Sequence, residues 1–148
     1  MPTRNASAVW EGGLKGGRGT YKGGESGLGG SYSFGSRFEQ AGGSNPEELL
    51  AAAHAACFSM ALSGALERAG TPARRVETQA ACTVEKVGEG FKITRMKLTT
   101  RAEVPNIDEA AFRKAAEGAK EGCPVSQALK GNLQIELDAQ LMQGAGAR

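Results

Sequence analysis

The sequence predicts an α+β protein, and three observations lead to that prediction. Residues 1–43 hold 13 of the 22 glycines, which alternate with short β-prone pieces as is typical of hairpins. A capped apolar helix follows, in which residues 49–66 contain no Asp, Glu, Lys or Arg. Alternating strands and shorter helices then complete the order βββ-α-ββ-αα-β.

The chain has 148 residues, which is the length of a single domain. Within it we expect a glycine-rich β unit, a core of helices and strands, and a frayed tail, at residues 1–43, 44–142 and 143–148. Three antiparallel strands are expected in the β unit, over Ser7–Trp10, Gly19–Lys22 and Ser31–Phe38. Alternation in the third strand places Tyr32, Phe34 and Phe38 on one face. Arg37 then lies on the other face, as a surface arginine would.

The long helix has clear start and stop signals. Asn45 at the N-cap, Pro46 at the first helical position and Glu48 at the third resemble a capping box. We expect the helix to run to about Ala69 and to stop at Gly70, a length of about 36 Å. Apolar residues on all its sides predict a helix that is buried all round. Because a chain of this size can hardly enclose such a helix, we predict a homodimer.

Five further elements are expected, with strands at 75–87 and from 91, helices at 106–121 and 124–130, and a strand at 133–141. The first two strands form a hairpin through Gly88-Glu89-Gly90. A change of phase in the apolar residues of the second strand predicts a bulge near Thr94–Arg95. The sheets are expected to be antiparallel and to surround the long buried helix.

Charge and targeting features favour a cytoplasmic protein. The net charge is only +2, which gives no electrostatic support to a nucleic-acid partner. The first residues contain no apolar run of the kind found in secretory signals, and three cysteines fit a reducing compartment. A membrane span needs about 20 strongly apolar residues, whereas the long helix is diluted by alanines, serines and a histidine. We therefore expect no membrane association.

The three cysteines differ in their surroundings. Cys57 lies in the middle of the long helix, where a small buried hydrophobic role is common. Cys123 precedes Pro124 at a helix N-terminus, where unpaired amides and the helix dipole favour a thiolate, although a plain capping role is equally open. Cys82 lies on the apolar face of a strand and is expected to be structural.

His54 is three residues before Cys57 on the same helical face, which would allow a Cys–His nucleophile pair. No third group to orient the imidazole is evident, so a core histidine is the favoured interpretation. One histidine and three cysteines without paired ligand spacing predict neither a metal site nor a cofactor.

Several segments resemble the OsmC/Ohr family, the osmotically inducible protein C and organic hydroperoxide resistance proteins. The stretch NPEELLAAAHAACFSMAL at 45–62 resembles the family's signature helix, and GCPVS at 122–126 resembles its second motif. SRF at 36–38 and WEG at 10–12 match as well, so that the resemblance covers nearly the whole chain. The arginine of SRF indicates the OsmC branch. Arg18 lies nearest the position of the active-site arginine in Ohr-like proteins and is the runner-up.

The resemblance implies an OsmC-like fold, an intertwined homodimer and a thiol-dependent peroxidase that prefers organic hydroperoxides over hydrogen peroxide. By matched position Cys57 would be the peroxidatic cysteine and Cys123 the resolving cysteine. Arg37 would activate the thiolate, and Glu47 would hold the arginine. A Cys57 sulfenic acid and then a Cys57–Cys123 disulfide would form, and an external dithiol, for example of the lipoyl type, would reduce the disulfide.

Helix geometry adds one constraint to this site. Glu47 and Cys57 are ten residues apart, which on one helix means about 15 Å of rise and roughly 80° of rotation. We therefore expect active sites shared between subunits, in which residues 1–43 embrace the partner and present Arg37. Phe58 and Met60 are expected to form an apolar wall for the alkyl group of a hydroperoxide.

Two other functions remain open from the residues. The first is a non-catalytic dimer that binds lipophilic ligands or has a structural role under stress. The second is a Cys–His hydrolase. Local electrostatics would also favour Cys123 over Cys57 as the attacking thiolate, whereas the resemblance assigns that role to Cys57.

Overall fold

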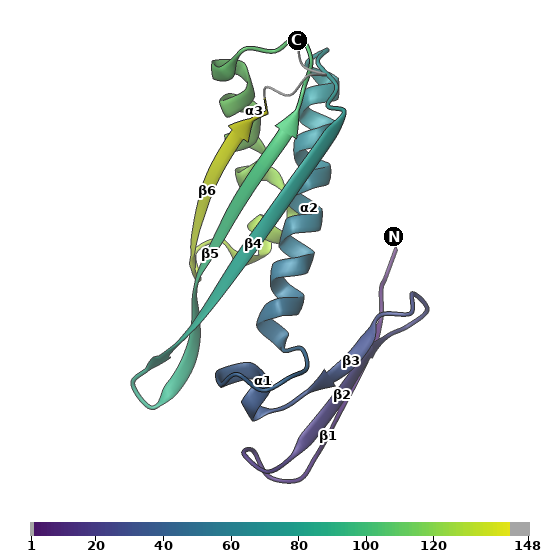
Figure 1. Cartoon of the computed structure of the whole chain (residues 1–148), viewed down its shortest axis with the longest axis vertical. Helices are drawn as coiled ribbons and strands as arrows, with labels where there is room; N and C mark the ends of the chain where they lie inside the picture. Colours follow the sequence, from purple (N-terminus) through teal and green to yellow (C-terminus); the bar gives the residue numbers. More distant parts are fainter. Residues whose placement is uncertain (1, 143–148) are drawn as a thin grey trace. The chain divides into compact units, whose positions relative to one another are not determined.

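The computed structural model describes residues 2–142, which form two compact units. The first unit extends to Leu49 and the second begins at Leu50 (Figure 1). The expected tail at 143–148 lies outside the described residues. The elements are β1 Ala6–Glu11, β2 Arg18–Gly23, β3 Gly29–Tyr32, α1 Phe34–Phe38, α2 Pro46–Arg68, β4 Arg75–Val87, β5 Gly90–Glu103, α3 Glu109–Gly122, α4 Pro124–Leu129 and β6 Gln134–Leu141.

The first unit contains the expected antiparallel sheet in the order β1-β2-β3. Aromatic side chains of all three strands pack together, with ring centroids of Trp10 and Tyr32 5.4 Å apart and those of Tyr21 and Tyr32 6.1 Å apart. Glycine allows this close packing, because a Cβ at Gly19 would lie 2.6 Å from the Tyr32 ring. The high glycine content is thus used in the sheet as well as in its turns.

The prediction of a strand over Ser31–Phe38 is wrong from Ser33 onward. The strand ends at Tyr32 and a short helix, α1, begins at Phe34. The reason is a capping box, in which Ser33 Oγ accepts a hydrogen bond from Ser36 N and Ser33 N donates one to Ser36 Oγ. Phe34 and Phe38 still share a face, since helical spacing also brings positions i and i+4 together, with ring centroids 5.0 Å apart.

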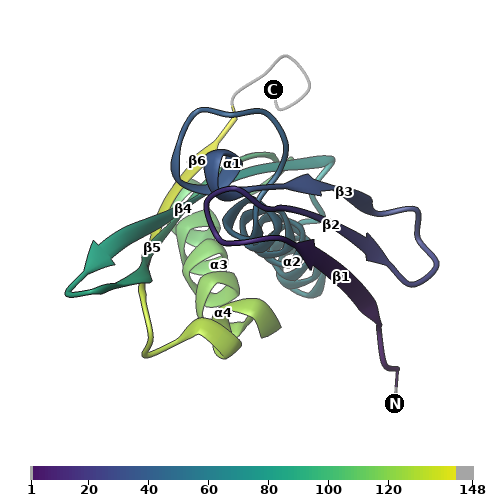
Figure 2. The same ribbon diagram turned by 90° about the horizontal axis from the view of Figure 1, so that it is seen from below.

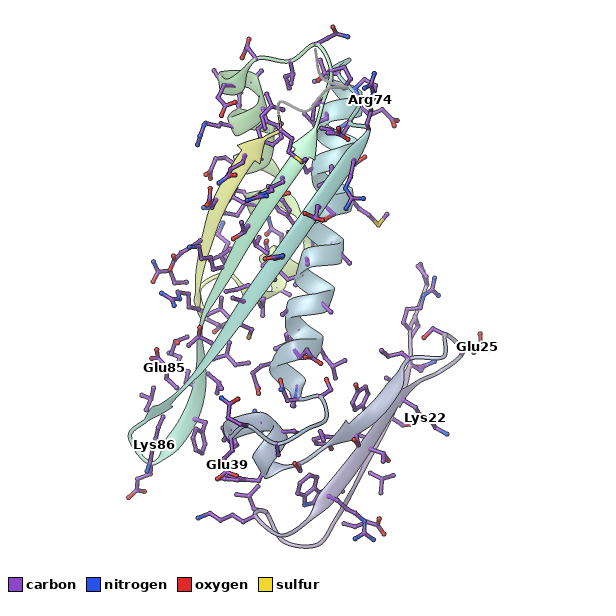
Figure 3. All side chains as sticks on the ribbon, in the orientation of Figure 1. Lys22, Glu25, Glu39, Arg74, Glu85 and Lys86 are labelled. Carbon is purple, nitrogen blue, oxygen red and sulfur yellow. The ribbon has the colours of Figure 1, made fainter. Side chains whose placement is uncertain are left out.

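The second unit has a three-stranded sheet in the order β4-β5-β6, with α2 and α3 packed on one of its faces (Figures 1 and 2). The core lies between these two layers and consists of fully buried side chains from both helices and from β5, among them Phe58, Leu62, Leu66, Met96, Leu98 and Phe112. The hairpin end of β4 and β5, which carries Glu85 and Lys86, extends beyond β6 (Figure 3).

One part of the sheet prediction needs correction. β6 pairs with β5 in parallel, with Arg95 opposite Gln134 and Ala102 opposite Leu141. The connection from β5 passes through α3 and α4 along the sheet face and returns to the starting end, which is the crossover that parallel pairing requires. The sheet of the second unit is therefore mixed, whereas the sheet of the first unit is antiparallel.

The predicted bulge is present in β5. Thr83 pairs with Arg95 and Val84 pairs with Ile93, which leaves Thr94 as the extra residue. The apolar residues of β5 change face at this point, as their phase in the sequence indicates. The bulge therefore marks where β5 passes from the two-stranded hairpin end to the three-stranded part of the sheet.

Helix α2 begins and ends close to the predicted residues. Asn45 Oδ1 accepts a hydrogen bond from Glu48 N at 2.7 Å, while the Glu48 carboxylate accepts one from Ser44 Oγ. Gly70, at φ +87°, ends the helix with a hydrogen bond to Glu67 O, and Thr71 N donates to Leu66 O. This pattern is a Schellman motif, in which glycine adopts the left-handed conformation without strain.

Only one face of α2 is buried within this chain, so the expected burial on all sides is not met here. His54, Phe58, Leu62 and Leu66 recur every four residues and are fully buried, whereas Met60 on another face is 79% exposed. By length and composition, α2 is the one helix in the described part of the chain that could cross a membrane. Its buried face packs against β5 and α3, as in the core helix of a globular protein.

Helix α3 begins two or three residues later than predicted. Asn106 adopts φ +65° in the preceding turn, and Asp108 is the N-cap, with Oδ1 2.8 Å from Ala111 N.

Asp108→Ala is expected to lower the free energy of unfolding by about 1 kcal/mol, measured by urea denaturation. Glu109→Ala is the matched control and should lower the free energy of unfolding by only about 0.3 kcal/mol, because the ion pair of Glu109 with Arg113 is exposed. Equal losses in both variants would contradict the capping role.

Candidate active site

Arg37 and Glu47 form a bidentate ion pair in the first unit. Arg37 Nε donates to Glu47 Oε1 at 2.9 Å, and Arg37 Nη2 donates to Glu47 Oε2 at 3.0 Å. Glu47 is 5% exposed, whereas the arginine side chain is only partly buried. Two parallel contacts to the carboxylate fix the plane of the guanidinium, and its remaining N–H groups stay available.

Hydrogen bonds between α1 and the start of α2 position this pair. Ser36 Oγ donates to Ser44 O at 2.7 Å, and Asn45 Nδ2 donates to Ser36 O at 2.9 Å. Arg37 also lies over the Phe38 ring, with Cζ 5.0 Å from the ring centroid. Arg37 is therefore carried by a short helix and not by the strand that alternation predicts.

Arg18, the alternative candidate for the activating arginine, has no buried carboxylate partner of this kind among the described residues. It is the first residue of β2, and its side chain is 84% exposed. Its nearest acidic contact is a single Nε–Oε1 distance of 3.9 Å to Glu11, an exposed pair of little energetic value. Of the two arginines, the geometry favours Arg37.

Cys57 and Cys123 meet in the second unit. Cys57 lies on α2 and is partly buried, while Cys123 is the N-cap of α4 and is 1% exposed. The two thiols lie close enough for Cys123 to affect the pKa of Cys57, and neither forms a disulfide in the structure. The structure thus brings together two pairs of predicted residues, Arg37 with Glu47 and Cys57 with Cys123.

The surroundings of Cys57 disfavour its thiolate within this chain. Burial raises the pKa of the Cys57 thiol, and the interaction with the neighbouring Cys123 thiol raises it further. A backbone hydrogen bond from Val125 lowers the pKa in part. A positive charge beside the sulfur would favour the thiolate of Cys57.

Ser126, a residue to which the sequence alone assigns no role, contacts both Cys123 and His54. Cys123 Sγ donates to Ser126 Oγ at 3.3 Å, and Ser126 Oγ lies 2.7 Å from His54 Nε2. His54 is fully buried, as expected of a core histidine, and its Nε2 is directed at the serine and not at Cys57. One signal in the sequence indicates the contact between Ser126 and Cys123. Ser126 follows Cys123 by three residues, which is the spacing at which an N-cap side chain meets the first turn of its helix.

The other expectations concern packing. Cys82 lies on the inward face of β4 and packs against the core. The apolar wall is corrected, because Phe58 is fully buried in the core whereas Met60 points away from it and is exposed. Among residues 2–142, no group of three His, Cys, Asp or Glu side chains could hold a metal ion.

Fold and site together define a class of protein, an α+β chain in which a cysteine of the central helix meets a cysteine at the N-cap of a later helix. The family model for OsmC-like proteins matches residues 39–138, and the chain belongs to that family. It is 47% identical over 140 residues to peroxiredoxin OsmC of Escherichia coli, covering 93% of this chain and 96% of that protein.

The family also includes relatives with the Ohr name. The organic hydroperoxide resistance protein of Xanthomonas axonopodis is 32% identical over 97 residues, which cover 64% of this chain and 66% of that protein. A crystal structure of an organic hydroperoxide resistance protein from Elizabethkingia anophelis superimposes with a TM-score of 0.74. At 23% identity, with 96% of this chain and 98% of that chain covered, this likeness supports the fold alone.

Proposed function

We propose that the protein is a thiol-dependent peroxidase that reduces organic hydroperoxides to alcohols, with hydrogen peroxide a poorer substrate. The observation that carries this proposal is the proximity of the thiols of Cys57 and Cys123. Two adjacent cysteines can store two electrons as dithiol and disulfide, without a metal or cofactor. The names peroxiredoxin and organic hydroperoxide resistance protein among the relatives support the same chemistry.

In the first step, the Cys57 thiolate attacks the terminal oxygen of the hydroperoxide. An S–O bond forms, the O–O bond breaks, and the alkoxide takes up a proton to become the alcohol, while Cys57 becomes a sulfenic acid. Because the surroundings of Cys57 raise its pKa, the step needs a cation at the sulfur. Arg37, held in orientation by Glu47, is the proposed cation.

In the second step, Cys123 attacks Cys57. The new S–S bond replaces the S–O bond of the sulfenic acid, and the oxygen leaves as water. An external dithiol then reduces the disulfide by thiol–disulfide exchange, and a lipoyl-type dithiol is one candidate. Because the two thiols lie close together in the reduced protein, little movement is needed for this step.

Each active site is proposed to combine residues of two subunits in a homodimer. α2 is an uninterrupted helix through Glu47 and Cys57, so these residues are separated by about 15 Å along its axis. An arginine paired with Glu47 is therefore badly placed for the cysteine of its own helix. The apolar, exposed side of α2, which includes Met60 and several alanines, supports burial by a second copy.

Mixed dimers test this sharing. Subunits carrying Cys57→Ser and Glu47→Gln are produced together with different tags, and dimers that carry both tags are isolated. If the cysteine of one chain works with the Glu47 of the other, each mixed dimer retains one intact site and about half of the wild-type activity. Mixed dimers with no more than half of the activity of the Glu47→Gln parent would place Cys57 and Glu47 of one site in the same chain.

A steady-state assay tests the proposed activity against the alternatives. Consumption of tert-butyl hydroperoxide, a fatty-acid hydroperoxide and hydrogen peroxide is compared, with dithiothreitol or dihydrolipoamide as reductant. The proposal predicts turnover that is fastest with the organic substrates. A lipophilic-ligand binder, a stress-structural dimer or a hydrolase would show no turnover, and none of these explains why two thiols meet. We also propose that the protein is soluble and cytoplasmic, because dithiol reductants are available in the cytoplasm.

A further inference from the structure

The proposed cycle leaves one fully buried titratable side chain without a task. His54 lies on α2, one turn before Cys57, and its imidazole is 0% exposed. Its Nε2 is 2.7 Å from Ser126 Oγ, although the two residues are 72 positions apart in the sequence. A polar ring at this depth is stable only with hydrogen bonds, so this contact is a specific feature of the core.

The contact continues from the serine to the resolving cysteine. Ser126 is 3% exposed, and its Oγ accepts a hydrogen bond from Cys123 Sγ at 3.3 Å. Ser126 N also donates to Cys123 Sγ, at 3.4 Å. Three buried side chains thus form a continuous hydrogen-bonded path from the imidazole through the hydroxyl to the thiol, all within the second unit.

The direction of this path follows from the single proton of the serine hydroxyl. If the Cys123 thiol donates to Ser126 Oγ, then the hydroxyl donates its own proton to His54 Nε2. In this arrangement the neutral ring would carry its proton on Nδ1, which has no hydrogen-bond partner among the described residues. Burial lowers the pKa of His54, so its Nε2 lone pair is available at neutral pH.

We propose that His54, acting through Ser126, accepts the proton of Cys123 during disulfide formation. This inference rests on the proposed peroxidase cycle and concerns only its second step. Ser126 contacts the reacting sulfur of Cys123, and His54 is a positioning residue that acts through Ser126. Buried imidazolium is unstable, so the proton stays on His54 only briefly.

The step balances in atoms and electrons. The Cys123 proton passes to Ser126 as the hydroxyl proton passes to His54 Nε2, and the Cys123 thiolate attacks Cys57. The S–S bond forms and the S–O bond breaks, so Cys123 is oxidised and the sulfenic sulfur of Cys57 is reduced. The departing hydroxide takes up one proton to become water, and the imidazolium releases one proton, so the net charge does not change.

The two steps can be measured separately in one experiment. Reduced protein is mixed with one equivalent of tert-butyl hydroperoxide, and samples are quenched over time with a dimedone probe and with an alkylating reagent. Mass spectrometry then gives the sulfenic acid at Cys57 and the loss of both thiols. His54→Gln retains a polar side chain but cannot accept the proton, and Ser126→Ala interrupts the path.

Both variants are expected to form the sulfenic acid at close to the wild-type rate and to form the disulfide about 100-fold more slowly. The sulfenic acid should therefore accumulate. Ser126→Thr keeps the hydroxyl and should form the disulfide faster than Ser126→Ala does. Ser59→Ala is the control, because it removes a hydroxyl contact of α2 with Thr78 at 2.7 Å without affecting the path.

Unchanged disulfide formation in His54→Gln and Ser126→Ala would overturn the inference, and Ser126→Ala decides alone if His54→Gln does not fold. A parallel loss of both steps would also overturn it, since that result indicates a purely structural role. Wild-type protein that forms neither sulfenic acid nor disulfide would instead refute the proposed function itself. The two failures are thus distinguishable.

Discussion

Cys57→Ser is expected to lower the turnover of tert-butyl hydroperoxide by about 10³-fold or more, to the rate of the reductant alone. A serine hydroxyl at this position stays protonated and cannot attack the O–O bond. Cys123→Ser is expected to behave differently, because its Cys57 still reacts. In the absence of a thiol reductant, that variant should consume one equivalent of hydroperoxide and then stop, with a sulfenic acid at Cys57 that a dimedone probe detects.

Cys82→Ser is the matched control for both cysteine variants. Cys82 packs against the core from β4 and takes no part in the contact between the two thiols. We expect it to retain most of its turnover, with a modest change in stability. A sulfenic acid trapped at Cys123 in Cys57→Ser would reverse the proposed order of the two cysteines.

Arg37→Gln is expected to slow the first step by about 10- to 100-fold at pH 7. Burial and Cys123 raise the pKa of Cys57, and the guanidinium of Arg37 is proposed to lower it again. Each unit by which the pKa rises above the working pH reduces the thiolate fraction about tenfold. Since only the thiolate reacts, the rate of the variant should increase with pH and approach the wild-type rate under alkaline conditions. Stopped-flow measurement of sulfenic acid formation between neutral and alkaline pH tests both parts.

Arg18→Gln is the matched control, because it makes the same substitution at the exposed runner-up. It should leave the pH profile of the first step unchanged. Glu47→Gln should lie between wild type and Arg37→Gln, since it keeps the guanidinium but weakens its bidentate contact. A large loss in Arg18→Gln with none in Arg37→Gln would assign activation to the arginine position of Ohr-like proteins.

The sequence predicts correctly those features of the fold that depend only on neighbouring residues. Asn45 and Gly70 mark the ends of α2 because capping groups act within one turn of a helix. The phase change around Thr94 predicted a bulge because side chains on a strand alternate strictly between its faces. Family resemblance, and not periodicity, singled out Arg37, Glu47, Cys57 and Cys123 as one set.

Features that depend on tertiary contacts were missed. Alternation in 133–141 is the same for a parallel and an antiparallel strand, so it could not show the direction of β6. The helix α1 was missed for a local reason, because Ser33 Oγ and Ser36 Oγ each accept a hydrogen bond from the backbone N–H of the other residue, against the alternation around them. The link between His54 and Ser126 joins distant parts of the chain, so no local pattern could predict it.

The most direct test of the central claim is the mass of the protein after one turnover without reductant. Reduced wild-type protein is treated with one equivalent of tert-butyl hydroperoxide, analysed intact without alkylation, and then analysed as peptides after alkylation of the remaining thiols. We predict a loss of two hydrogens, about 2 Da, with a single disulfide that links Cys57 to Cys123. An unchanged mass, or a disulfide that involves Cys82, would contradict the proposed peroxidase cycle.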